Sequence, residues 1–130
     1  MSAASTSTDG YLSSTDWTVF NNKADKQGFK EVSSSTYTVI DADRNSFIAL
    51  QVSCEFTLDS AITNSWDPGD EIEIVRMGGV SPATTISITG GPTAYGLSYP
   101  SGSTFLEFTS SYEGVRLKKI DANTWLVIDL

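Results

Sequence analysis

The side chains that most often perform catalysis are scarce in this sequence. It contains no histidine and one cysteine, Cys54. Without histidine, neither a Ser-His-Asp nor a Cys-His arrangement can form, and the commonest transition-metal ligand is missing. A single cysteine cannot form a disulfide within the chain or a thiolate zinc site. We therefore expect Cys54 to be a buried, unreactive thiol, which leaves carboxylates as the remaining groups with catalytic potential.

Two carboxylates are enough for glycoside hydrolysis, so two of the acidic residues could form a catalytic acid pair. Glu71 and Glu73 alternate with isoleucines, Glu55 lies in another strand pattern, and Asp59 and Asp70 fall near strand ends. A general acid needs an apolar pocket that raises its pKa. Because the alternation places Glu71 and Glu73 on the solvent face, we predict that the chain is not an enzyme; the alternative is an acid-pair hydrolase.

The segment Asp41-Ala-Asp43-Arg-Asn45 spells the opening of a calcium-binding loop. Such a loop needs glycine at its sixth position and glutamate at its twelfth, where this chain has Ser46 and Val52. We therefore predict a polar hairpin turn here, with no metal site and no cofactor.

Aromatic residues outside the strand patterns are the candidate ligand-binding residues. They are Trp66, Tyr95, Tyr99 and Tyr112. Aromatic faces beside Asn, Asp and Ser suit sugar stacking or a protein interface. The alternative is that these rings cover the ends of the folded body or fill a seam between copies of the chain.

One short helix is predicted over residues 10–27. Ser13 can act as its N-cap, and Leu12 before the cap can pack on Trp17. Trp17, Phe20 and Ala24 then form an apolar stripe. A helix of about three turns is marginal unless that stripe is buried. The stripe either docks on the chain's own body or meets symmetry-related copies, and we favour self-association through Leu12, Trp17 and Phe20.

From residue 35 onward the apolar runs are short, β-branched and separated by turn residues, which predicts strands throughout. The run Phe47 to Leu58 alternates as one strand, with Ile48, Val52 and Phe56 on its inner side. The predicted fold is mainly β, an antiparallel β-sandwich or jelly-roll body with one short N-terminal α-helix. The predicted parts are a flexible arm (1–9), a helical stem and linker for trimerisation (10–34) and the β-sandwich body (35–130).

The net charge of −8 disfavours nucleic acid as a partner, because phosphate neutralisation needs clustered lysine and arginine. The first eight residues lack the basic and apolar regions of a signal peptide, and no apolar run is long enough to span a membrane. We therefore expect synthesis in the cytoplasm and no membrane insertion.

The segment Thr8-Asp-Gly-Tyr-Leu-Ser-Ser-Thr-Asp-Trp-Thr-Val-Phe-Asn-Asn-Lys23 resembles one found in bacteriophage tail fibres and related virion proteins. The closing pattern Asp121-Ala-Asn-Thr-Trp-Leu-Val127 is similar to the end of small β modules in such proteins. The resemblance implies a homotrimer without catalytic residues, located in the virion, whose N-terminal arm binds other virion proteins. A receptor- or carbohydrate-binding module that recognises a host surface glycan or protein, or a capsid decoration protein, is the alternative.

Overall fold

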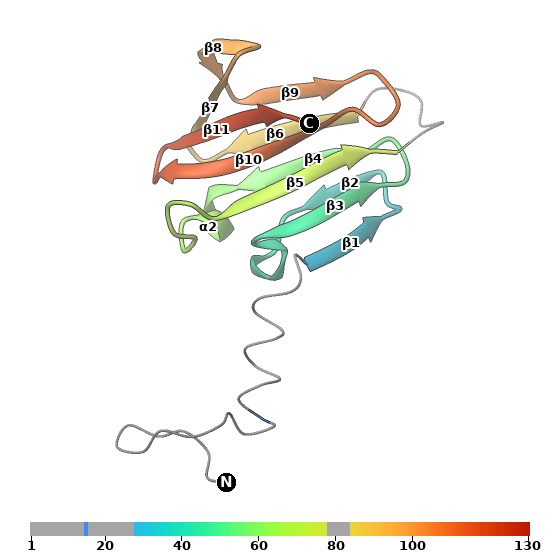
Figure 1. Ribbon diagram of the computed structural model, residues 1–130, viewed down its shortest axis with the longest axis horizontal. Helices are drawn as coiled ribbons and strands as arrows, with labels where there is room; N and C mark the ends of the chain where they lie inside the picture. The colour runs from blue at the N-terminus through green and yellow to red at the C-terminus, as the bar shows by residue number, and fades with distance from the viewer. Residues whose placement is uncertain (1–14, 16–27, 78–83) are drawn as a thin grey trace, which may run out of the picture.

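The computed structural model describes residues 15, 28–77 and 84–130, and these are mainly β. Eleven strands within the described residues form two sheets, which Figure 1 shows as two layers. The seven-stranded sheet has the order β1 (Gly28–Val32), β3 (Ser46–Leu50), β5 (Glu71–Arg76), β10 (Gly114–Asp121), β11 (Thr124–Asp129), β7 (Thr93–Gly96) and β8 (Tyr99–Ser103). The four-stranded sheet has the order β2 (Thr36–Thr38), β4 (Glu55–Asp59), β6 (Thr84–Thr89) and β9 (Phe105–Phe108).

The chain alternates between the two sheets from β1 to β6, so each strand returns beside the one before it in the same sheet. Strands β1, β3 and β5 are therefore parallel neighbours, as are β2, β4 and β6. Among the nine pairings of the described strands, five are parallel, which corrects the predicted antiparallel arrangement. Side chains alternate with the same period in both kinds of sheet, so the sequence pattern could not distinguish them.

One hydrophobic core lies between the sheets and draws on both of them. The inward positions predicted for β5 are confirmed, because Ile72 and Ile74 are fully buried. Trp125 is 1% exposed and lies in this core, and Cys54 is a buried free thiol as predicted. The core is therefore continuous across both layers, and the period-two pattern identified most of it.

The predicted single strand from Phe47 to Leu58 is wrong. Strand β3 ends at Leu50 and β4 begins at Glu55 in the other sheet, so Val52 lies in the crossing and is 36% exposed. Backbone hydrogen bonds fix both ends of the crossing: Gln51 N–H donates to Val32 and Glu55 N–H donates to Ser35. The alternation of side chains continues by chance through a change of sheet.

The body begins earlier than predicted. Residues 28–32 were assigned to a linker, but they form β1, which pairs in parallel with β3, and Val32 is 3% exposed in the core. The predicted hairpin turn at residues 41–46 is also corrected. It contains a short 3-10 helix, η1 (Asp41–Asp43), and connects β2 to β3 in different sheets. The arm over residues 1–9 and, apart from Thr15, the helix over residues 10–27 lie outside the described residues.

Two other turns agree with the sequence. Asp70 N–H donates to the Asp67 carbonyl, and Gly69 between them has φ +96°, which only glycine adopts without strain. Strands β10 and β11 form a closing hairpin, in which Asp121 is opposite Thr124. The segment after Gly90 holds β7 and β8, although its glycines and the short length of these strands are typical of a loop.

Candidate functional site

A shallow apolar groove lies on the seven-stranded sheet where β7 turns away from β11. Its volume is about 490 Å³, and its lining is Gly96, Leu97, Leu126, Val127, Ile128 and Asp129. The parallel pairing of β7 with β11 ends at Tyr95 and Leu126, so the last residues of β11 extend beyond it. The Leu97 side chain is 97% exposed beside the groove. The sequence pattern does not indicate this groove, because the glycines and prolines of residues 90–102 are typical of a loop.

Tyr95 and Tyr99 belong to the same hairpin, but their side chains lie on opposite faces of it. Tyr95 follows buried Ala94, is 42% exposed, and lies opposite Leu126 on the outer face. A Cβ added at Gly102 would lie 2.9 Å from the Tyr95 ring, so the absence of a side chain at Gly102 lets that ring approach β8 closely. Tyr99 packs against the core, and burial, followed by the nearby charges of Asp129 and Glu113, raises its pKa. Of these two tyrosines, Tyr95 is therefore the one exposed on the outer face, next to Leu126 of the groove lining.

Tyr112 stands apart on the turn between β9 and β10. Its side chain is 69% exposed, and its φ of +62° is unusual for a large residue. The Glu113 carboxylate holds the turn by accepting hydrogen bonds from the backbone N–H groups of Thr109 and Ser110, at 2.8 and 3.1 Å. The turn therefore displays the Tyr112 ring to solvent, as the sequence led us to expect.

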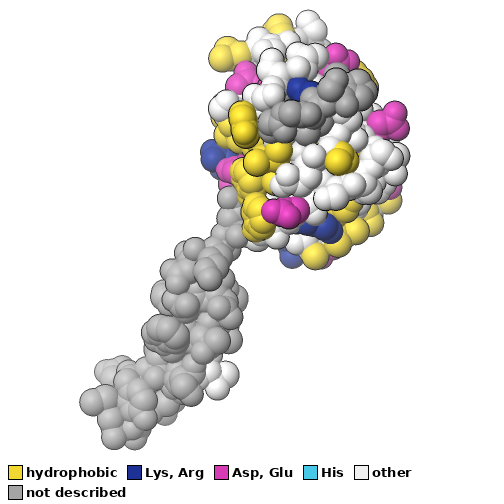
Figure 2. Space-filling view, turned by 90° about the vertical axis from the view of Figure 1, so that its right-hand side faces the viewer, with side chains coloured by type: hydrophobic (Ala, Val, Ile, Leu, Met, Phe, Trp, Pro, Cys, Tyr) yellow, Lys and Arg dark blue, Asp and Glu magenta, His cyan; other side chains and the backbone are white. Residues whose placement is uncertain are grey.

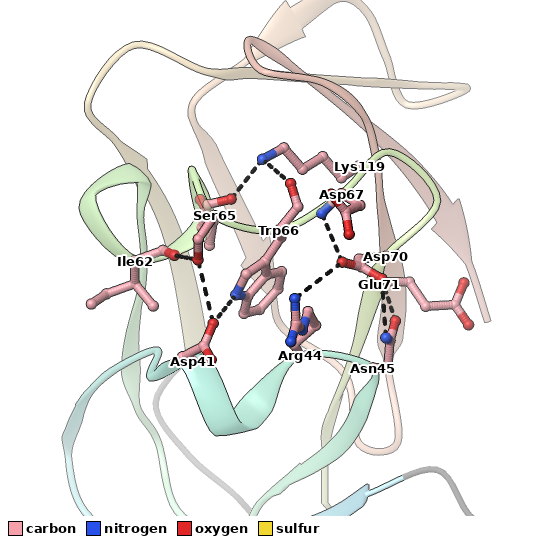
Figure 3. Close-up of polar contacts among 11 residues, drawn as sticks. Asp41, Arg44, Asn45, Ile62, Ser65, Trp66, Asp67, Asp70, Glu71 and Lys119 are labelled. Atoms are coloured by element: carbon pink, nitrogen blue, oxygen red, sulfur yellow. Dashed lines mark hydrogen bonds and ion pairs between the residues drawn. The ribbon is translucent and has the colours of Figure 1, made fainter. Parts of the chain in front are cut away.

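Trp66 is not a surface residue, which corrects its place among the candidate ligand-binding aromatics. It is 2% exposed and meets Trp125 edge to face, with ring centroids 6.0 Å apart. Its indole N–H donates to Asp41 at 3.1 Å, as Figure 3 shows. Asp41, which lies 25 residues earlier in the chain, satisfies the indole N–H, so the ring is part of the core.

Lys119 holds the backbone around Trp66 in place. Its ammonium donates to the carbonyl oxygens of Thr63 and Trp66 at 2.6 and 2.7 Å, and the residue is 4% exposed (Figure 3). These carbonyls belong to the last residue of α2 (Ser60–Thr63) and to the turn that follows it. A cation suits the carbonyl end of a helix, because the carbonyl groups there lack helical partners. Its alternation with Leu117 and Val115 on β10 was the sequence signal for an inward lysine.

The candidate acid pair forms part of a charged ladder. Glu73 accepts two hydrogen bonds from the Arg116 guanidinium, at 2.9 and 2.7 Å. Glu71 lies 3.7 Å from both Arg116 and Lys118. The hydrogen bond to Glu73, together with the charges of Glu73 and Glu71, raises the pKa of Arg116. Each carboxylate therefore faces a cation across the sheet and is held in an ion pair.

The calcium-like segment does not gather its acidic side chains. Asp41 turns towards Trp66, whereas Asp43 accepts hydrogen bonds from the Tyr37 hydroxyl at 2.5 Å and from the Ile40 N–H at 3.0 Å. The two carboxylates thus point to different partners. Within residues 28–77 and 84–130, no group of three or more acidic or sulfur side chains is placed to hold a metal ion.

Sequence analysis missed a partly buried polar cluster at the β1 edge. The Lys30 ammonium donates to the Tyr37 hydroxyl at 2.6 Å and lies 3.7 Å from Asp43, which is 3% exposed. Burial, followed by the hydrogen bond to Asp43 and its charge, raises the pKa of Tyr37. The cluster joins β1, β2 and η1 and closes the space between the sheets at this end. Its alternation signal was hidden because residues 28–32 were assigned to a linker.

The candidate oligomerisation residues Leu12, Trp17 and Phe20 lie outside the described residues. The face of the body in Figure 2 carries hydrophobic side chains in separate patches between polar and charged ones. The described helices are too short and too polar to cross a bilayer.

In comparisons with known proteins, the chain matches no family model, no curated protein and no solved structure.

Proposed function

We propose that this chain is a non-enzymatic structural protein of a bacteriophage particle, made in the host cytoplasm and incorporated into the virion. It would be a short, trimeric, fibre-like component attached to tail, baseplate, neck or capsid. In this proposal the two sheets form a β-sandwich body, residues 10–27 form a helical stem, and residues 1–9 form the arm that binds other virion proteins.

The observation that carries the proposal is the apolar stripe Trp17, Phe20 and Ala24 within a segment that resembles phage fibre proteins. A short helix with two large aromatic residues on one face needs a partner surface, and three copies around one axis supply it. Strand β1 begins at Gly28, soon after the last stripe residue Ala24, so a trimer of stems would hold three bodies side by side. The ion-paired carboxylates on the sheet are consistent with a structural role.

The test is the molar mass of the full chain in solution, measured by light scattering. The wild-type protein is expected at three times the 14.0 kDa of one chain. Phe20→Asp places a charge on the stripe and should give monomers, whereas Thr15→Asp adds the same charge at an exposed position and should leave trimers. A wild-type monomer at micromolar concentration would refute the proposal.

Attachment to a particle is tested separately. The full chain should co-sediment with particles assembled from the remaining virion proteins, and a variant lacking residues 1–9 should remain trimeric but stay in the supernatant. Retention of that variant on the particle would show that the arm is not the attachment element.

A second candidate function is host recognition, because Tyr95 and Tyr112 are exposed aromatic rings and Tyr95 borders the groove. Aromatic rings of this kind stack on sugars or anchor protein contacts. Tyr95→Ala and Tyr112→Ala should then weaken adsorption to host cells or binding to a glycan array. Phe105→Ala is the matched control, since Phe105 is 48% exposed in the other sheet. Unchanged adsorption in both tyrosine variants leaves a purely structural role, including that of a capsid decoration protein.

A further inference from the structure

Phe29 is the first outward-facing residue of the described body. It lies on β1, one residue after the body begins at Gly28, and it is 65% exposed. Its ring stacks on Phe47 of β3, with centroids 5.9 Å apart and ring planes 10° apart. The stack fixes the ring against the sheet while leaving most of the side chain open. Phe29 is thus a preorganised apolar surface at the edge nearest the N-terminal segment.

The covalent chain limits how far Phe29 can lie from the proposed three-fold axis. Phe29 follows Ala24 by five residues, so their Cα atoms are at most about 18 Å apart. Helices that pack through such a stripe lie about 8–10 Å from one another. The exposed Leu97 lies five strand spacings from β1 across the same sheet, about 24 Å farther away. Of the exposed apolar side chains on the body, Phe29 is therefore the one that the chain ties most closely to the axis.

The chemistry of β1 favours side-chain packing over addition of another strand. β1 is the edge of its sheet, but Lys30 points inward to Tyr37 and Asp43. An inward charge on an edge strand disfavours pairing with a further strand. An added strand would cover the Lys30 side chain, which is 35% exposed. We therefore expect a neighbouring copy to contact this edge through the Phe29 ring rather than through strand pairing.

We propose that the Phe29 rings of three copies meet around the axis and form an apolar cluster next to the stem. Each Phe29 ring stacks on Phe47 of its own chain. The occupant of this surface is a second and third copy of the same chain. The inference rests on the proposed trimer and goes beyond it, because a trimer held by the stem alone would leave the three bodies independent.

The test is crosslinking of the full chain with a short bismaleimide after Phe29→Cys. Wild-type protein contains only Cys54, which is buried and whose pKa is raised to about 11 by burial and by the charge of Glu55, so it should not react. Around a three-fold axis, three thiols can form only one pair. About two thirds of the Phe29→Cys chains should then become covalent dimers, and about one third should remain single.

Leu97→Cys is the matched control, because Leu97 is 97% exposed on the same sheet but at the far edge. It should give no covalent dimers. Equal crosslinking of the two variants would indicate random collisions and overturn the inference. Conversion of nearly all Phe29→Cys chains to dimers would indicate a two-fold contact and overturn it as well.

Glu31→Cys provides a second readout that keeps Phe29 in place. Glu31 is exposed two residues farther along β1, on the same side as Phe29. It should also crosslink above the Leu97→Cys level. If light scattering shows a trimer but neither β1 variant crosslinks, the Phe29 contact is refuted and the proposed trimer stands. If light scattering shows a monomer, the proposed function itself fails.

Discussion

Replacement of Lys119 by methionine tests whether a buried cation holds the loop that follows α2. The ammonium donates to two backbone carbonyls, those of Thr63 and Trp66, and both residues are buried. Methionine keeps much of the side-chain length and apolar volume but cannot donate a hydrogen bond. The substitution therefore removes the donor with little change in packing.

The expected cost follows from two opposing effects. Each carbonyl left without a partner in the interior costs about 1–3 kcal/mol. Part of this cost is offset, because methionine removes a charge that folding had to take out of water. We expect a net loss of about 2–4 kcal/mol in the free energy of unfolding.

Urea unfolding followed by tryptophan fluorescence measures this loss, because Trp66 and Trp125 meet beside the loop. Lys118→Met is the matched control on the adjacent residue. The Lys118 side chain is 42% exposed and lies 3.7 Å from Glu71, so its loss should cost less than about 1 kcal/mol. Protein concentration is held fixed, since self-association would contribute to stability. Equal midpoints for the two variants, with unchanged slopes, would refute the assigned role of Lys119.

Three further predictions concern buried polar groups. Trp66→Phe removes the N–H that binds Asp41 and should lower stability by about 1–3 kcal/mol in urea unfolding. Tyr37→Phe removes the hydroxyl that binds Asp43 and should cost a similar amount. Burial raises the pKa of Cys54 from its ordinary value of 9.0 to about 11, so the unfolded state loses its proton first as pH rises. Stability should fall between these two pH values by up to about 2.7 kcal/mol relative to Cys54→Ala.

The controls for these predictions use groups of the same chemistry in exposed positions. Tyr112→Phe removes a hydroxyl from a side chain that is 69% exposed and should change stability by less than about 0.5 kcal/mol. A loss as large as that of Tyr37→Phe would contradict the role of the buried cluster. For Cys54, a constant difference between wild type and Cys54→Ala from pH 8 to pH 12 would show that the thiol does not titrate differently in the two states.

The parts of the fold that the sequence could predict are those set by local chemistry. Glu71 to Ile74 alternates between acidic and apolar residues, and the inward Ile72 and Ile74 are buried as expected. The turn at Asp67 to Asp70 follows from proline and glycine in the right order, and the closing hairpin follows from two strand patterns joined by Asp121-Ala-Asn123. In each case the deciding interactions lie within a few residues of one another.

The parts that could not be predicted depend on contacts between distant segments. Trp66 stands among Ser, Asn and Asp, which is typical of an exposed loop. Its burial depends on distant residues, among them Asp41, Trp125 and Lys119. The groove beside Leu97 arises because β7 leaves β11, an event that no residue pattern near Leu97 records. Of the four candidate aromatic residues, Tyr95 and Tyr112 are exposed, Tyr99 is partly buried against the core and Trp66 is buried. Ligand binding by the exposed rings stays a prediction.

The buried polar groups share a position in the topology that explains why they are there. Lys30, Tyr37 and Asp43 surround the crossing from β2 to β3, and Lys119 holds the crossing from β4 to β5. Apolar burial is not directional and cannot by itself specify where a chain changes sheets, whereas hydrogen bonds can. These clusters therefore fix the points at which the chain crosses from one sheet to the other. Among the described residues, the apolar surfaces open to partners include Phe29 at the β1 edge and the groove beside Leu97 at β7 and β11.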